Sequence, residues 1–159
     1  MNCMAEYVVM LLFRIMPSSE GGNNSSSVEH FVPKSIAPKL AYEWSNYRLA
    51  SRKANTDRGD KYVLDPFEVD DEWFVLDLFS GVLSANPSLE CVLKEKVEQT
   101  IGNLKLNSRY WKNIRIRHFE RFNKDFTEAG GNTEEQKKAE LQLKTNAPIV
   151  WKAWMKLGH

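Results

Sequence analysis

The residues from 28 to 61 constrain the fold most, because they specify a strand, a loop, a second strand and a short helix in close succession. Residues 28–32 (VEHFV) alternate along the chain as a short strand does, and Pro33 would end that strand by removing a backbone donor. Residues 47–50 predict the returning strand. Ser51 is an expected N-cap for a helix over about residues 51–57. We therefore expect a small hairpin followed at once by a helix.

The chain before this stretch divides into an apolar element and a linker. Residues 7–13 (YVVMLLF) form the most apolar run, which is too short to span a bilayer. Glu6 precedes it and Arg14 follows it, a pattern unlike that of a signal peptide. Residues 17–27 are rich in Gly, Ser and Asn and predict a linker. We expect residues 1–27 to form an N-terminal element and linker in a cytoplasmic protein with no membrane partner.

The two cysteines, Cys3 and Cys91, are too few for a disulfide framework or a four-ligand zinc site. They favour a reducing compartment. The net charge of +1 excludes a strongly basic chain, so any affinity for an anionic partner must come from local clusters.

Residues 61–78 predict further strands, since YVLDPF and WFVLDLF are rich in aromatic and β-branched residues. The acidic residues 70–72 between the two runs predict a turn. Together with residues 81–85, they complete a β-rich core that we place at residues 28–85.

Residues 86–159 predict a helical C-terminal half. Asn86 is the expected N-cap of a long helix with an apolar stripe, and a second helix should begin at residue 107 or 108 and end near residue 125. Thr133 and Gln136 predict a capping box for a third helix, and Asn146 with Pro148 predicts the start of a last one. The expected class is α+β.

Four residues of the central stretch are candidates for chemistry. His30 stands beside Glu29, and Asn46 and Asn55 follow on the hairpin and the helix. Carboxylate and amide oxygens suit Mg²⁺, and a neutral imidazole can accept a proton from an attacking water. A lone histidine on a strand is nevertheless more often structural than catalytic. Basic residues that we expect to contact phosphates lie nearby and on the second helix: Lys34, Arg48, Arg52, Lys53, Arg58, Lys61, Arg117 and Arg121.

The segments VEHFVPKS, LAYEWSNYRLAS and KANTDRGD, in this order, resemble the ββα-metal unit of HNH endonucleases. They are most similar to the HNH nucleases that accompany ATPases in Septu and retron-type anti-phage systems. The resemblance implies a small ββα-metal core with additional strands that cleaves DNA with Mg²⁺ or Mn²⁺. It implies His30 as general base, Asn46 as the residue that orients the loop, and Glu29 and Asn55 as metal ligands. It also implies an ATPase partner in a defence system.

The chain departs from that family at its structural zinc site. Ser51 and Ala54 stand where the family has two cysteines, and the second cysteine pair is also missing. We expect this chain to lack the zinc and to draw its stability from packing. The alternative function is therefore a catalytically inactive HNH-fold module that binds nucleic acid or a partner protein.

Residues 108–124 carry six basic residues and one acidic residue. Trp111, Ile114, His118 and Phe122 form one stripe at helical spacing, which favours a core face and a structural His118. Arg117, Arg121 and Lys124 lie on another face. Three interpretations stay open for that face: it contacts DNA phosphates, contacts an acidic partner, or is merely solvated. We expect Trp151 and Trp154 to be buried or part of a partner interface, and a third interpretation is a structural subunit that docks the ATPase through them.

Overall fold

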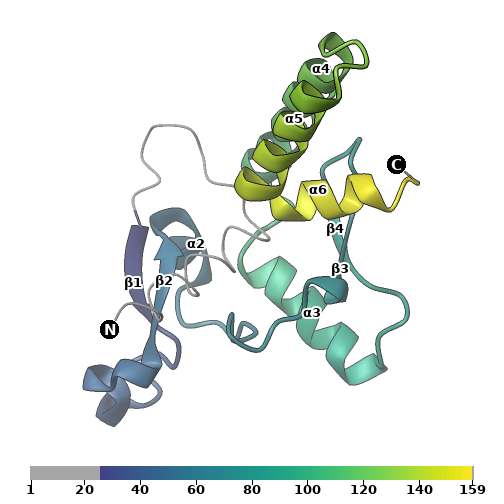
Figure 1. The fold of residues 1–159 in the computed structure, drawn as a ribbon. Coiled ribbons are helices and arrows are strands. Elements are labelled where there is room, and N and C mark those ends of the chain that lie inside the picture. The colour runs from purple at the N-terminus through teal and green to yellow at the C-terminus, as the bar shows by residue number, and fades with distance from the viewer. Residues whose placement is uncertain (1–25, 159) are drawn as a thin grey trace.

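The structure is a computed structural model that describes residues 26–158. Within that range it contains two small antiparallel sheets and a helical C-terminal half, so the α+β class is confirmed (Figure 1). The predicted apolar element at residues 7–13 and nearly all of the linker lie outside the described residues. No helix among residues 26–158 is long and apolar enough to cross a membrane.

The predicted hairpin and helix are present. Strand β1 (Ser26–His30) pairs antiparallel with β2 (Tyr47–Ser51), and α2 (Arg52–Arg58) follows at once. The Ser51 hydroxyl accepts a hydrogen bond from the Ala54 backbone amide at 3.1 Å, which caps α2 as expected. Strand β1 ends two residues earlier than predicted. The backbone amides of Phe31 and Val32 donate to the carbonyl and the side chain of Asn46, and not to a residue of β2. Two 3₁₀ turns, η1 (Pro38–Tyr42) and η2 (Trp44–Asn46), connect the strands.

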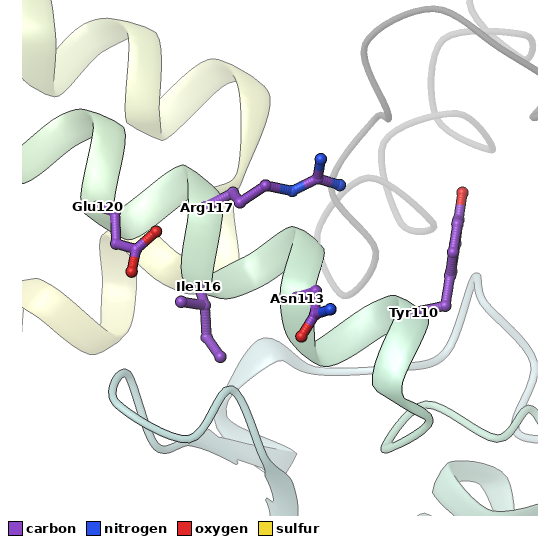
Figure 2. Close-up of a pocket in the computed structure, with 5 residues that line it drawn as sticks. All are labelled: Tyr110, Asn113, Ile116, Arg117 and Glu120. Atoms are coloured by element: carbon purple, nitrogen blue, oxygen red, sulfur yellow. The ribbon is translucent and has the colours of Figure 1, made fainter.

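After α2 come η3 (Asp71–Trp73) and the antiparallel strands β3 (Phe74–Leu76) and β4 (Leu83–Ala85), which precede the helical C-terminal half. The helices α3 (Cys91–Asn103), α4 (Arg109–Glu128), α5 (Thr133–Asn146) and α6 (Pro148–Met155) follow. Helices α4 and α5 stand side by side, and α6 crosses near the β3–β4 sheet (Figure 1). A shallow hollow of about 380 Å³ along α4 is lined by Tyr110, Asn113, Ile116, Arg117 and Glu120 (Figure 2).

One core joins the two halves. Ala54 of α2 is buried in the same cluster as Val97 of α3, Trp111 of α4 and Trp154 of α6. The predicted apolar faces of α3 and α4 therefore point inward, as their spacing indicates. Because Trp154 packs against Phe122, with ring centroids 4.8 Å apart, it is a core residue and is not available as a docking residue.

A second link is polar. Asp57 of α2 accepts hydrogen bonds from Lys53 at 2.8 Å and from Lys105 at 3.0 Å, so it ties α2 to the segment that follows α3. Burial raises the pKa of this carboxyl, but the two lysines outweigh it and hold the pKa below its usual range.

The strand predicted for YVLDPF is wrong. Residues 62–67 run as an irregular segment over α3, with their backbone bonded to side chains. The Leu64 amide donates to the Thr100 hydroxyl at 3.0 Å, and the Asn103 amide donates to the Tyr62 carbonyl at 2.6 Å. The Asp65 carboxylate accepts from the Phe67 amide at 3.0 Å, which forms a local turn. Residues 70–72 likewise belong mainly to η3 and its cap.

Two predicted helix starts are displaced, whereas α4 begins after Ser108 and α6 begins at Pro148, as expected. Asn86 accepts from the Ser88 amide in a separate turn, and the N-cap of α3 is Glu90, four residues later. Asn132, which precedes the expected Thr133, caps α5 through bonds from the Glu134 and Glu135 amides. Asn146 is the last residue of α5, and Pro148 opens α6. No side chain caps α3 or α6, whereas at α5 the Asn132 side chain takes the cap in place of the adjacent Thr133.

Candidate active site of the ββα unit

His30 lies at the end of β1 with its imidazole held in one orientation. Its Nε2 is 2.9 Å from the Ala41 carbonyl oxygen, an atom that can only accept a hydrogen bond. Nε2 must therefore carry the proton in the neutral ring, and Nδ1 has the free lone pair. The ring also packs against Tyr47, with centroids 5.0 Å apart, and the Tyr47 hydroxyl donates to the same Ala41 carbonyl at 2.7 Å.

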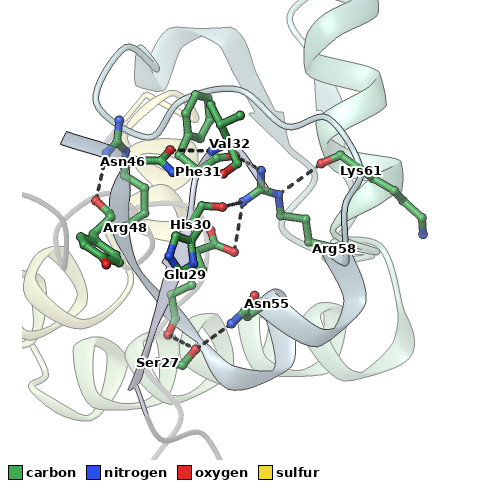
Figure 3. A network of polar contacts seen from close by, with 12 residues as sticks. Ser27, Glu29, His30, Phe31, Val32, Asn46, Arg48, Asn55, Arg58 and Lys61 are labelled. Atoms are coloured by element: carbon green, nitrogen blue, oxygen red, sulfur yellow. Dashed lines mark hydrogen bonds and ion pairs between the residues drawn. The ribbon is translucent and has the colours of Figure 1, made fainter. Parts of the chain in front are cut away.

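Asn46 holds the loop that supplies this carbonyl. Its Oδ1 accepts from the Val32 amide at 2.7 Å, and its Nδ2 donates to the carbonyls of Val32 at 3.0 Å and Leu40 at 3.1 Å. The side chain is buried. An amide is the group that can donate and accept at once in this way. Asn46 thus fixes the loop geometry around His30, and it does so from the interior (Figure 3).

Glu29 is paired with Arg58. The Glu29 Oε2 lies 3.2 Å from Arg58 Nη1, and both side chains are largely shielded from solvent. The same guanidinium donates to the carbonyls of His30, Phe31 and Lys61 (Figure 3). Burial raises the pKa of the Glu29 carboxyl, and the charge of Arg58 offsets only part of that rise.

Asn55 faces the same side of β1 as Glu29. Its Nδ2 lies 3.4 Å from the Ser27 hydroxyl, and Ser27 and Glu29 share one strand face because side chains alternate along β1. Asn55 and Arg58 are three residues apart on α2 and hence neighbours on its surface. Glu29 is therefore bracketed by an amide and a guanidinium from α2.

Glu29 and Asn55 carry oxygen atoms of the types that Mg²⁺ accepts. Glu29 and Asn55 each offer an oxygen, and Mg²⁺ usually retains several waters and takes only one or two carboxylates from the protein. Within residues 26–158, no group of three His, Cys, Asp or Glu side chains gathers as a metal site. The Arg58 pair also competes with a cation for Glu29. The set thus suits a hydrated, weakly held ion and not a dedicated metal cage.

Ser51 and Ala54, which stand where the HNH family has two cysteines, have structural roles in this chain. Ser51 caps α2, and Ala54 is almost completely buried against the C-terminal half. A cysteine thiol is a weaker acceptor for a cap than a hydroxyl. The substitutions are therefore consistent with α2 being held by its cap and the shared core.

Two of the eight expected phosphate contacts are buried. Arg48 donates to both carboxylate oxygens of Asp65, at 2.9 Å and 2.5 Å, and to the carbonyls of Ser45 and Tyr47. It is 6% exposed and Arg58 is 2% exposed. Because both guanidiniums already bond to protein acceptors, we withdraw Arg48 and Arg58 as phosphate contacts.

The remaining six basic residues occupy two separate places. Lys34, Arg52 and Lys61 are exposed around the ββα unit, while Lys53 is half-buried beside Asp57 and the Tyr110 ring. Arg117 and Arg121 are exposed on α4, about two and three helical turns beyond Tyr110. The structure therefore does not bring these two arginines to His30.

Sequence reasoning missed the structural contribution of Arg58 and the two exposed aromatic residues of the loop between β1 and β2, Tyr42 and Trp44. The one available signal for Arg58 was its place three residues after Asn55. For Tyr42 and Trp44, it was their position in a loop that shows no apolar periodicity.

No protein-family model matches the chain, and no curated protein matches it either. The resemblance to HNH endonucleases rests on the three sequence segments quoted above.

Proposed function

We propose that this chain is a divalent-metal-dependent endonuclease of the HNH type that hydrolyses phosphodiester bonds of DNA. The observation that carries the proposal is the His30 imidazole, whose Nε2–H is committed to the Ala41 carbonyl at 2.9 Å. That bond leaves Nδ1 as a proton acceptor on the ββα unit that also carries Glu29 and Asn55, whose side chains take the other face of β1.

In this proposal His30 Nδ1 takes a proton from the water that attacks the phosphorus. Such general base catalysis typically contributes about 10²- to 10⁴-fold. Asn46 and Tyr47 act as positioning residues, because they fix the loop carbonyl and the ring on either side of the imidazole. Glu29 and Asn55 would hold Mg²⁺ or Mn²⁺, which would supply charge stabilisation at the phosphate and its leaving oxygen.

In this proposal the exposed side chains of Lys34, Arg52 and Lys61 contact the DNA phosphates near the ββα unit. Lys53 contributes less to DNA binding, because it is paired with Asp57. Arg117 and Arg121 form a separate basic site on α4, suited to a more distant part of the same DNA. Phosphate contacts release counterions, so affinity for DNA should fall steeply with salt.

The resemblance also suggests the biological setting: a cytoplasmic nuclease of a bacterial anti-phage system that works with an ATPase. Cells that carry the native gene neighbourhood should resist phage, and His30→Ala should abolish that resistance at unchanged protein level. If cells with His30→Ala resisted phage as well as cells with wild type, His30 would not be needed for defence.

The nuclease proposal is tested with supercoiled plasmid, incubated with Mg²⁺, Mn²⁺ or chelator. Wild type and His118→Ala should nick the plasmid only with metal, whereas His30→Ala should not. His118 is the matched control because it is the other histidine of residues 26–158. Cleavage by His30→Ala at the wild-type rate would refute the assignment of the base.

One observation favours the inactive binding module: Arg58 already neutralises Glu29, the only carboxylate in the donor set. That module would bind DNA without cleaving it. Titration with Mn²⁺, followed by electron paramagnetic resonance, would then show that wild type and Glu29→Gln bind the ion equally weakly. Tighter Mn²⁺ binding by wild type would instead favour the nuclease.

A further inference from the structure

The loop between β1 and β2 presents two aromatic side chains to solvent. Tyr42 is 90% exposed and Trp44 is 87% exposed, whereas Trp111 is 0% exposed. Single exposed apolar residues are common. Two almost fully exposed aromatic rings two positions apart on one short loop form an uncommon surface, of a kind that marks an interaction site.

The loop that carries them is held in place. Backbone bonds close its two 3₁₀ turns, from the Glu43 amide to the Leu40 carbonyl at 3.2 Å and from the Asn46 amide to the Glu43 carbonyl at 2.9 Å. The Asn46 side chain adds two bonds to the loop and its entry. Tyr42 and Trp44 are therefore displayed by an ordered support, so little backbone entropy is lost when they bind.

The exposed tryptophan is connected to the candidate base through one ring. Trp44 meets Tyr47 edge to face, with centroids 5.7 Å apart, and Tyr47 packs on His30 at 5.0 Å. The loop lies at the end of the hairpin away from helices α4–α6 (Figure 1). A ligand on Trp44 is thus separated from His30 by the Tyr47 ring alone and lies clear of the helical half.

The charges of the loop indicate the ligand's chemistry. Lys34 and Lys39 are exposed on it, against a single acidic residue, Glu43. Aromatic rings flanked by cations are the elements with which proteins hold single-stranded nucleic acid: bases stack on the rings, and cations follow the phosphates. A closed duplex hides the faces of its bases, so these rings can stack only where bases are unpaired.

We infer that Tyr42 and Trp44 form a base-stacking platform that selects unpaired DNA next to His30. This inference rests on the proposed function, since it names the substrate class of that nuclease. The substrate is single-stranded DNA or a duplex with an opened segment, and the nucleotide stacked on Trp44 places a neighbouring phosphate at the imidazole.

The test is binding of a fluorescently labelled single-stranded 12-mer of thymidylate and of a mixed-sequence 12-base-pair duplex, measured by anisotropy in chelator so that nothing is cleaved. Trp44→Leu and Tyr42→Leu should each weaken binding of the single strand roughly 5- to 150-fold and leave duplex binding unchanged. The matched control is Phe79→Leu, because Phe79 is also exposed, at 81%, in the turn between β3 and β4. It should bind both DNAs as wild type does.

Tryptophan emission gives a second readout. Among the five tryptophans, Trp44 is the only exposed one, so unlabelled thymidylate should quench wild-type emission through it. Trp44→Phe should keep the affinity, because phenylalanine also stacks, but should lose the quenching.

Three results would overturn the inference: no binding of the single strand by wild type, equal affinity of wild type and Trp44→Leu for it, or wild-type dimerisation that Trp44→Leu abolishes. The last result would assign the surface to a second copy of the chain. Because binding is read without catalysis, a chain that stacks DNA but never cleaves it would disprove the nuclease and leave this inference standing.

Discussion

Arg58 Nη1 lies 3.2 Å from Glu29 Oε2, and the same guanidinium donates to the carbonyls of His30 and Phe31 at the end of β1 and of Lys61 after α2. This arginine is thereby the link between α2 and the strand that carries His30. It also occupies part of the coordination space of the candidate metal ligand. Arg58 thus stabilises the ββα unit and at the same time lowers the affinity of Glu29 for a metal ion.

Arg58→Met should destabilise the protein by about 3–5 kcal/mol, because it leaves Glu29 shielded from water without its partner. In a Glu29→Gln background the same change should cost less, since no unpaired charge remains. Urea denaturation of the four proteins measures this coupling. Equal costs in the two backgrounds would show that the ion pair contributes nothing beyond the three carbonyl bonds.

The raised pKa of Glu29 has a defined effect on stability. Below pH 4.5 the Glu29 carboxyl is protonated in both the folded and the unfolded state. As the pH rises above 4.5, the unfolded chain loses this proton before the folded protein does. The folded state therefore binds more protons, and its stability falls as pH rises through the folded pKa. The free energy of unfolding of wild type relative to Glu29→Gln should decrease from pH 4.5 upward. An increase would mean that Arg58 lowers this pKa.

Asn46→Ala should destabilise the protein by about 3 kcal/mol, because it removes three hydrogen bonds and leaves buried backbone groups of Val32 and Leu40 without partners. Asn46→Asp should recover only part of the loss, since a carboxylate accepts from the Val32 amide but cannot donate. Ser45→Ala, at an exposed neighbouring position, is the control and should stay within about 0.5 kcal/mol of wild type.

Two glycines should respond to alanine in opposite directions. Gly81 has φ +66°, and an added Cβ would lie 2.7 Å from the Lys112 carbonyl oxygen, so Gly81→Ala should cost about 2 kcal/mol or more. Gly102 lies within α3 with open space around it, so Gly102→Ala should stabilise the protein by about 0.5–1 kcal/mol. Thermal melting of both variants checks the contrast. Stabilisation by Gly81→Ala would show that α4 moves away from this turn at little cost.

The features predictable from sequence were those set by neighbouring residues. The Ser51 cap, the hairpin, and the apolar faces of α3 and α4 follow from local chemistry and periodicity. The irregular path of residues 62–67 was not predictable, because it depends on Thr100 and Asn103 of α3.

For the candidate site, the sequence predicted a hairpin and a following helix that carry His30, Glu29, Asn46 and Asn55, and these elements are present. The roles of the four residues stay predictions. It did not indicate that Arg48 and Arg58 are buried. A basic residue looks the same in sequence whether it meets a phosphate or a carboxylate such as Asp65, and that carboxylate is 17 residues away from Arg48.

The most direct test of the central claim is the single-turnover rate of DNA cleavage with saturating Mg²⁺, using a substrate that carries an unpaired segment. Wild type should cleave, and His30→Ala should be about 10²- to 10⁴-fold slower while it melts at the wild-type temperature and binds DNA with wild-type affinity. A folded His30→Ala protein that cleaves as fast as wild type would contradict the account.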